Sequence, residues 1–210
     1  MRTLIAVPCL DMVHTYFMVS LLGMTKPEGT EITVSGTSLV YDARNMLAHK
    51  AVHEGYDRVL WLDSDMHFPA DLLPRLAADL DEGREFVSAV YFTRKDPIEP
   101  CIYEVCHDVE TKRGEIRAVA QSVKAIPEHI FEIEGCGFGA VMMTTDLIRR
   151  VGRLPFFPEH GYGEDLSFCR RAREAGAKLF CDGRIKVDHI GTTMFNNETW
   201  LCRGGGENGG

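Results

Sequence analysis

The strongest constraint in this sequence is a short apolar run that ends in two acidic residues. Residues 59–62 are Val, Leu, Trp and Leu, and Asp63-Ser64-Asp65 follows them directly. A strand with one solvent-exposed face alternates polar and apolar residues, whereas a strand covered on both faces is apolar throughout. We therefore expect a central strand of a sheet that carries helices on both sides, with Asp63 and Asp65 where the strand ends.

The rest of the chain alternates between predicted strands and predicted helices. Strands are expected at 3–8, 31–35, 58–62, 85–92, 131–143, 177–181 and 185–189, and helices at 11–24, 39–53, 69–80, from 145 onward and at 164–175. The stretch 96–126, with weak alternation and two prolines, predicts a loop and a short hairpin. This order indicates the α/β class, with a mostly parallel, Rossmann-like central sheet flanked by helices.

Length and charge limit the class of protein. A chain of 210 residues, 45% of them hydrophobic, suits one core, so we expect a single domain over 1–203 and a flexible Gly-rich tail at 204–210. The net charge of -8 gives no general attraction to nucleic acid or anionic lipid. The sequence has neither a signal-peptide pattern nor a membrane segment, so a cytoplasmic protein is expected. Seven scattered cysteines indicate reduced thiols.

Two of the predicted strands end at candidate ligand-binding residues. Ligands bind at the carboxyl ends of strands in parallel sheets, so Pro8 and Cys9 should share one crevice with Asp63 and Asp65. Two carboxylates at alternate positions can hold a hard divalent cation whose other ligands are diphosphate oxygens. An Asp-x-Asp triplet also occurs in ordinary solvated turns, so its surroundings must decide between these interpretations.

Two further signals lie in the second half of the chain. Glu164 and Asp165 begin a predicted helix after a glycine-flanked loop, where acids cap the helix and stay ionised, as a general base requires. His189 ends a predicted strand, where an imidazole is either structural or completes a metal site.

Together these features resemble the family 2 glycosyltransferases of the GT-A fold, over Thr3 to about Thr193. The resemblance is carried by the apolar strand with its Asp63-Ser64-Asp65 (DXD) motif, the run Gly135-Cys136-Gly137-Phe138-Gly139-Ala140, the pair Glu164-Asp165, and His189.

The resemblance implies a hexosyl- or pentosyltransferase that moves a sugar from a nucleoside-diphosphate sugar to an acceptor hydroxyl, with inversion, using Mn or Mg. Asp65 and His189 would bind the metal, and Asp63 would contact the ribose or a metal-bound water. Asp165 would be the catalytic base, with Glu164 beside it.

The resemblance also implies the donor and acceptor contacts. The donor side would comprise Pro8, Cys9, Arg44, Asn45, Asp63 and Ser64, and the sugar and acceptor pocket Gly135, Cys136, Gly137, Phe138 and Gly139. Family members usually carry an acidic residue after the second strand, where this chain has Gly36, Thr37 and Ser38, so the nucleobase is open. The chain also resembles compact members from bacteriophage genomes, which would act in the host cytoplasm. The acceptor stays open between a saccharide, a protein and a modified DNA base.

Two other functions remain open at this point. A sugar-phosphate nucleotidyltransferase would need a glycine-rich, lysine-containing loop soon after the first strand, and none follows Pro8. A non-catalytic nucleotide-sugar binding protein would keep Asp63 and Asp65 but would need no base.

Overall fold

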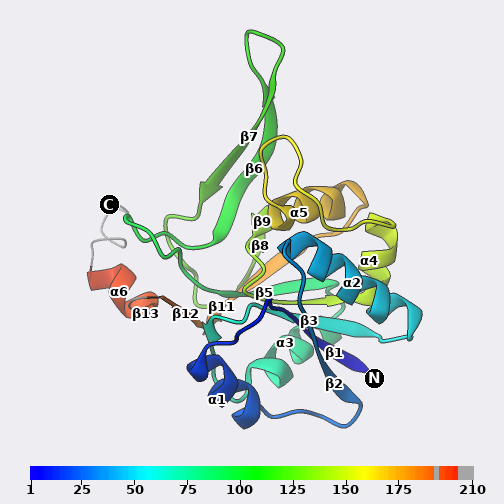
Figure 1. The fold of residues 1–210 in the computed structure, drawn as a ribbon. Helices are drawn as coiled ribbons and strands as arrows, with labels where there is room; N and C mark the ends of the chain where they lie inside the picture. The colour runs from blue at the N-terminus through cyan, green and yellow to red at the C-terminus, as the bar shows by residue number, and fades with distance from the viewer. Residues whose placement is uncertain (192–193, 203–210) are drawn as a thin grey trace.

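A seven-stranded sheet forms the centre of the computed structural model, which describes residues 1–191 and 194–202 (Figure 1). Its strands are β1 (Thr3–Pro8), β2 (Thr30–Ser35), β3 (Arg58–Leu62), β5 (Phe86–Val90), β8 (Ile130–Ile133), β10 (Ala140–Thr144) and β11 (Leu179–Lys186). They lie in the order β2-β1-β3-β10-β5-β11-β8. The predicted tail 204–210 lies outside the described residues.

Two small sheets and six helices complete the described part of the chain. The small sheets are β13-β12-β4, formed by β4 (Met66–His67), β12 (Asp188–Ile190) and β13 (Met194–Phe195), and β7-β6-β9, formed by β6 (Ile102–Glu110), β7 (Ile116–Ser122) and β9 (Gly135–Cys136). The helices are α1 (Thr15–Gly23), α2 (Val40–His53), α3 (Leu72–Asp81), α4 (Thr145–Val151), α5 (Glu164–Glu174) and α6 (Asn197–Cys202). In the part of the chain described, no helix is long and apolar enough to cross a membrane.

The central sheet is mostly parallel. β2, β1, β3, β5 and β11 run in one direction, and only β10 and β8 run against their neighbours. Helices cover both faces, with α2, α4 and α5 on one side and α1 and α3 on the other. This architecture confirms the predicted α/β class.

The strand β3 shows why its sequence is apolar throughout. Val59 and Trp61 belong to the core beneath α2, α4 and α5, whereas Leu60 and Leu62 belong to the core beneath α1 and α3. All four side chains are fully buried. Successive strand residues point to opposite faces, so a strand between two helical layers needs an apolar residue at every position.

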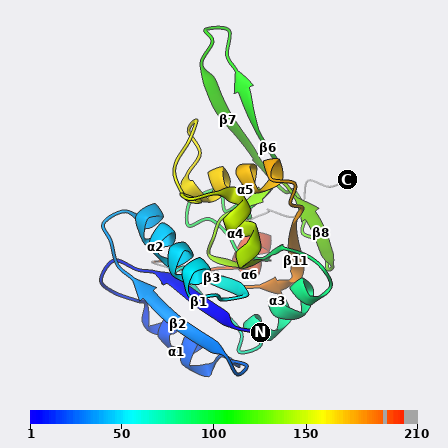
Figure 2. The same cartoon turned by 90° about the vertical axis from the view of Figure 1, so that its right-hand side faces the viewer.

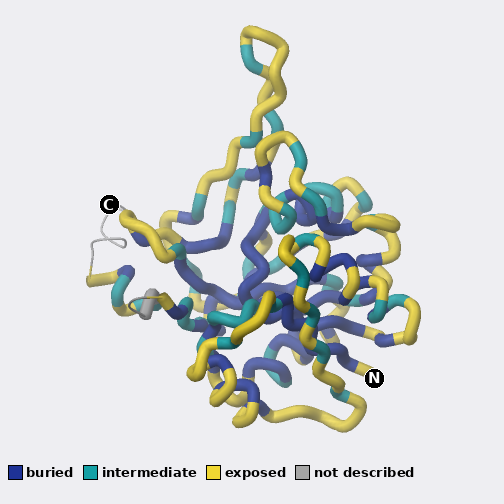
Figure 3. The backbone as a smooth tube through the Cα atoms, in the orientation of Figure 1, coloured by how far each residue is buried: buried dark blue, intermediate teal, exposed yellow. Residues whose placement is uncertain are grey.

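The hairpin of β6 and β7 extends away from the body of the protein in both views (Figures 1 and 2). Most of its outer part is exposed, in contrast to the buried central strands (Figure 3). The sequence predicted a short hairpin, and the structure shows a long one. Its turn closes at Gly114, whose φ of 76° lies in the left-handed region that glycine favours.

Several predicted boundaries are wrong. The single strand predicted at 131–143 is three strands, β8, β9 and β10, of which β9 lies in a different sheet from the other two. α1 begins at Thr15 rather than residue 11, because the side chain of His14 caps it by accepting a hydrogen bond from the Tyr16 amide. α3 begins at Leu72 rather than residue 69. The predicted strands 177–181 and 185–189 are divided differently in the structure. β11 joins the end of the first to the start of the second and runs through Gly183, where an added Cβ would lie 1.8 Å from the Pro127 carbonyl oxygen. His189 lies in the separate short strand β12.

Candidate active site

A cavity of about 340 Å³ lies where β1, β3 and β5 end and α5 begins. It brings together nine residues predicted from the sequence: Pro8, Arg44, Asp63, Ser64, Asp65, Phe138, Glu164, Asp165 and His189. Val40, Tyr91 and Arg94 complete its lining and were not predicted. Residues up to 181 positions apart in the chain, Pro8 and His189 (189 − 8), therefore share one cavity.

Arg44 is the buried cation of this cavity. Its side chain is 3% exposed, and its Nη2 donates to Asp63 Oδ1 at 2.8 Å while its Nε donates to Glu164 Oε1 at 3.2 Å. The guanidinium also lies 5.4 Å from the centre of the Phe138 ring. Burial alone would lower the pKa of Arg44, but the charges of Asp63, Glu164 and Asp165 outweigh it and raise the pKa.

Asp65 and His189 form a second cluster in the cavity. His189 Nδ1 lies 2.8 Å from the carbonyl oxygen of Phe92, which can only accept, so this nitrogen carries the hydrogen. In the neutral imidazole the lone pair is therefore on Nε2, which lies 3.5 Å from Asp65 Oδ2. The ring of Tyr91 packs edge-on against the imidazole, with the ring centres 5.4 Å apart.

This arrangement has the chemistry of a divalent-cation site. An imidazole nitrogen and a carboxylate oxygen converge, and a backbone carbonyl orients the imidazole from behind, as is usual for a metal-binding histidine. Across the described residues, no three His, Cys, Asp or Glu side chains form a ready cation cluster. Asp65 and His189 would therefore hold a metal as a pair, with the remaining ligands supplied by bound substrate or water.

Arg94 also contacts Asp65. Its Nη1 lies 2.8 Å from Asp65 Oδ2 and donates to the Ile190 carbonyl oxygen at 3.1 Å. Burial favours the neutral acid, but His189, which in its protonated form donates from Nε2, and the charge of Arg94 together outweigh burial and lower the pKa of Asp65. Asp65 is thus an ionised carboxylate surrounded by nitrogen atoms.

Asp165 stands at the start of α5, and its carboxylate accepts a hydrogen bond from the Leu166 amide at 2.7 Å. Burial, with the neighbouring charge of Glu164, raises its pKa to about 6. Gly137 lies beside this acid and makes room for Tyr91: an added Cβ would be in ordinary contact with Asp165 Oδ2, at 3.5 Å, but only 1.8 Å from the Tyr91 hydroxyl. A side chain at this position would force Tyr91 out of the cavity wall.

Several predicted contacts lie elsewhere. Asn45 was expected on the donor side, but its amide exchanges two hydrogen bonds with the backbone of Phe156, at 2.6 and 3.0 Å, and does not line the cavity. It fixes the loop that leads to α5. Cys9 lines an adjoining hollow of about 200 Å³ with Thr37 and Ser38. This hollow shares Pro8, Val40 and Ser64 with the main cavity.

The glycine run contributes less to the cavity than predicted. Phe138 is its one member in the cavity lining. Cys136 is fully buried in the core, Gly135 faces Leu166 and Cys169, and Gly139 faces Met66 and Tyr91. Small residues are needed at these positions because neighbouring side chains pack closely against them. They therefore support the cavity wall without lining it.

Comparison with solved structures shows the fold. The chain is similar to A197 from STIV, with a TM-score of 0.70 and 18% identity over 93% of this chain and 94% of that one. It is also similar to GalNAc-T7, solved with UDP, GalNAc and Mn2+, with a TM-score of 0.61 and 11% identity over 90% of this chain and 44% of that one. No family model and no curated protein sequence matches it.

These likenesses show the fold alone: the chain has a GT-A-like fold. It spans less than half the length of GalNAc-T7, so that protein's substrates are not carried over with the fold.

Replacing Arg44 with Met should lower the free energy of unfolding by about 2–4 kcal/mol at pH 7, because it leaves two partly buried carboxylates without their cation. Urea unfolding measures this. Arg117→Met removes an exposed ion pair to Glu115 and should cost about 1 kcal/mol or less. Equal losses in the two variants would contradict a special role for Arg44.

Replacing Asp165 with Asn should stabilise the protein at pH 8. An acid whose pKa rises from 3.8 to about 6 on folding favours the folded state less as the pH rises through this window. The gain should be about 3 kcal/mol at pH 8 and should vanish near pH 3.5. Urea unfolding at both values checks it, with Asp146→Asn, an exposed acid at the start of α4, as the control. A pH-independent difference would contradict the raised pKa.

Proposed function

We propose that this protein is a metal-dependent glycosyltransferase that transfers a sugar from a nucleoside-diphosphate sugar to an acceptor hydroxyl, with inversion. The observation that carries the proposal is one cavity that holds both the Asp65–His189 pair and Asp165. Asp65 and His189 could bind a cation that contacts the donor diphosphate, and Asp165 could take a proton from the acceptor. The GT-A-like fold supports the same reaction.

The donor would bind along the ends of β1 and β3. Pro8, Ser64 and Val40 border both the main cavity and the adjoining hollow, so a nucleotide could extend from one into the other. When bound by Asp65 and His189, a Mn2+ or Mg2+ ion would supply positive charge that stabilises the departing diphosphate. The solved GalNAc-T7 contained UDP and Mn2+, which is consistent with this donor chemistry.

Asp165 would act as the base. It takes the proton from the acceptor hydroxyl as that oxygen bonds to the anomeric carbon, and the bond from the sugar to the diphosphate breaks. Attack on the face opposite the diphosphate inverts the anomeric configuration. A pKa of about 6 leaves Asp165 ionised at neutral pH yet more basic than an ordinary carboxylate. The acceptor would be a saccharide, a protein or a modified DNA base.

In this proposal Glu164 is not the base but a neighbour that influences Asp165. Its carboxylate is held by Arg44, and its charge helps to raise the pKa of Asp165. Asp63 is likewise held by Arg44 and faces the cavity beside Asp65, where it can contact a ribose or a metal-bound water.

A screen of nucleotide-sugars with and without Mn2+ tests the proposal. Release of nucleoside diphosphate should require the metal and should fall as the pH drops below about 6, because Asp165 becomes protonated. Asp165→Ala should lower the rate by about 10²–10⁴-fold while calorimetry shows nucleoside-diphosphate binding largely unchanged.

The control for this test is Asp146→Ala, which removes an acid from the first turn of α4 and should leave both rate and binding intact. Unchanged turnover in Asp165→Ala would remove the base from the proposal. Tight donor binding with no turnover in the wild-type protein would indicate a non-catalytic nucleotide-sugar binding protein instead.

A further inference from the structure

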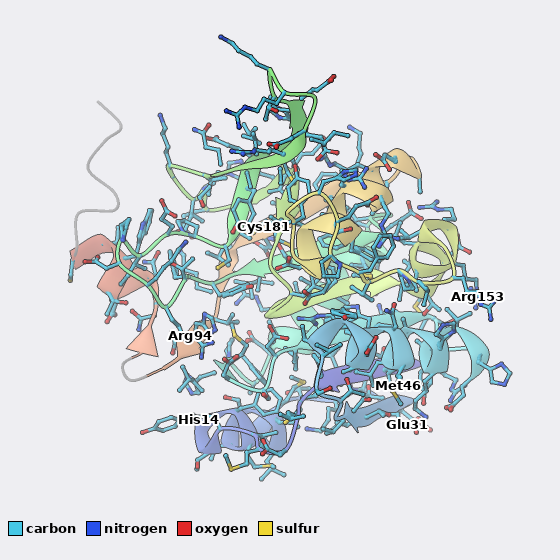
Figure 4. The ribbon with its side chains drawn as sticks, turned by 45° about the horizontal axis from the view of Figure 1, so that its top comes forward. His14, Glu31, Met46, Arg94, Arg153 and Cys181 are labelled. Carbon is cyan, nitrogen blue, oxygen red and sulfur yellow. The ribbon has the colours of Figure 1, made fainter. Side chains whose placement is uncertain are left out.

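Arg94, which is labelled in Figure 4, follows β5 in the chain. It contacts the C-terminal part of the fold by donating a hydrogen bond to the Ile190 carbonyl oxygen. Its side chain is 45% exposed, in contrast to the 3% of Arg44. The carboxylate that it contacts is that of Asp65, and this contact is an ion pair in the wall of the main cavity. An exposed arginine next to a single carboxylate can change its conformation at little cost.

The contact falls on one particular oxygen. Arg94 Nη1 lies 2.8 Å from Asp65 Oδ2, and His189 Nε2 lies 3.5 Å from the same atom. A divalent cation shared by Asp65 and His189 would need this oxygen. Two cations at one oxygen repel each other, so the guanidinium and a metal cannot both remain there without loss of free energy.

A guanidinium that leaves Asp65 needs another anion. The cavity that Arg94 lines is the one in which the proposed donor diphosphate would lie. A planar guanidinium binds two phosphate oxygens at once, which makes arginine well suited to this partner.

We propose that Arg94 is an exchangeable ligand of the donor site: it neutralises Asp65 before the donor binds and moves to the diphosphate when a divalent cation takes its place. This inference rests on the proposed function and adds a donor-binding residue to it. Arg94 leaves one negative group and pairs with another, so the guanidinium keeps a partner in both states.

The test compares wild-type protein with Arg94→Met in two binding measurements. Titration of Mn2+ alone, followed by electron paramagnetic resonance, should show roughly three- to fivefold tighter binding in the variant, because the competing cation is gone. Calorimetry with pyrophosphate at saturating Mn2+ should show binding weaker by about tenfold or more, because a charge-assisted hydrogen bond is lost. Pyrophosphate is used because it does not depend on the nucleobase.

Two control variants sharpen the comparison. Arg150→Met breaks an ion pair of equal length, 2.8 Å to Glu85, at similar exposure but outside the cavity, and should change neither affinity. Arg94→Lys keeps the charge, so Mn2+ affinity should stay near the wild-type value while pyrophosphate binding weakens.

The outcomes separate this inference from the proposed function. If Arg94→Met binds Mn2+ no more tightly than the wild-type protein does, the exchange alone is overturned. Equal pyrophosphate affinity in the two proteins would also overturn the exchange alone. If neither the wild-type protein nor the variant binds Mn2+, the exchange and the metal-dependent reaction are both overturned.

Discussion

The ion pairs of Arg44 hold the acidic side of the cavity together. Asp63 comes from the end of β3 and Glu164 from the start of α5, and one buried guanidinium binds both. Without it these carboxylates, with Asp165 beside them, would repel one another in a partly desolvated space. The relative position of the sheet and α5 at this point therefore depends on a cation supplied by α2.

The cavity contains a second arginine in a different situation. Arg94 is half exposed and pairs with Asp65, whereas Arg44 is buried between two acids. A buried cation with two partners keeps its position, and an exposed one with a single carboxylate partner exchanges more easily. The cavity therefore has one side held in place by Arg44, which carries Asp165. On its other side, the ion pair of Arg94 with Asp65 can open when substrate binds.

The sequence predicted those features that depend on local pattern. The unbroken apolar run of β3 identified a strand buried on both faces, and a strand end and a helix start located Asp63, Asp65 and Asp165. His189 was expected at the end of a strand, whereas it lies in the middle of β12. The parallel majority of the sheet followed from the alternation of strands and helices. The reversal of β10 in its middle did not, because strand direction is set by pairing between distant segments.

Side-chain direction was predicted less well. Asn45 is adjacent to Arg44 on α2, yet it points to Phe156 instead of the cavity, because successive helical residues face different ways. Arg94 was missed because it lies in a loop with no periodic pattern, and its contact with Asp65 spans 29 positions (94 − 65). A charged residue just beyond the predicted strand 85–92 was the available signal, since ligands gather at strand ends.

The central claim is that Asp65 and His189 hold a divalent cation on the donor diphosphate. Anomalous X-ray scattering from crystals grown with Mn2+ and a nucleoside diphosphate tests it most directly. The account predicts a manganese peak bonded to the Asp65 carboxylate and to His189 Nε2, with the diphosphate completing its coordination. A nucleotide bound without manganese at these residues, or manganese bound elsewhere in the protein, would contradict it.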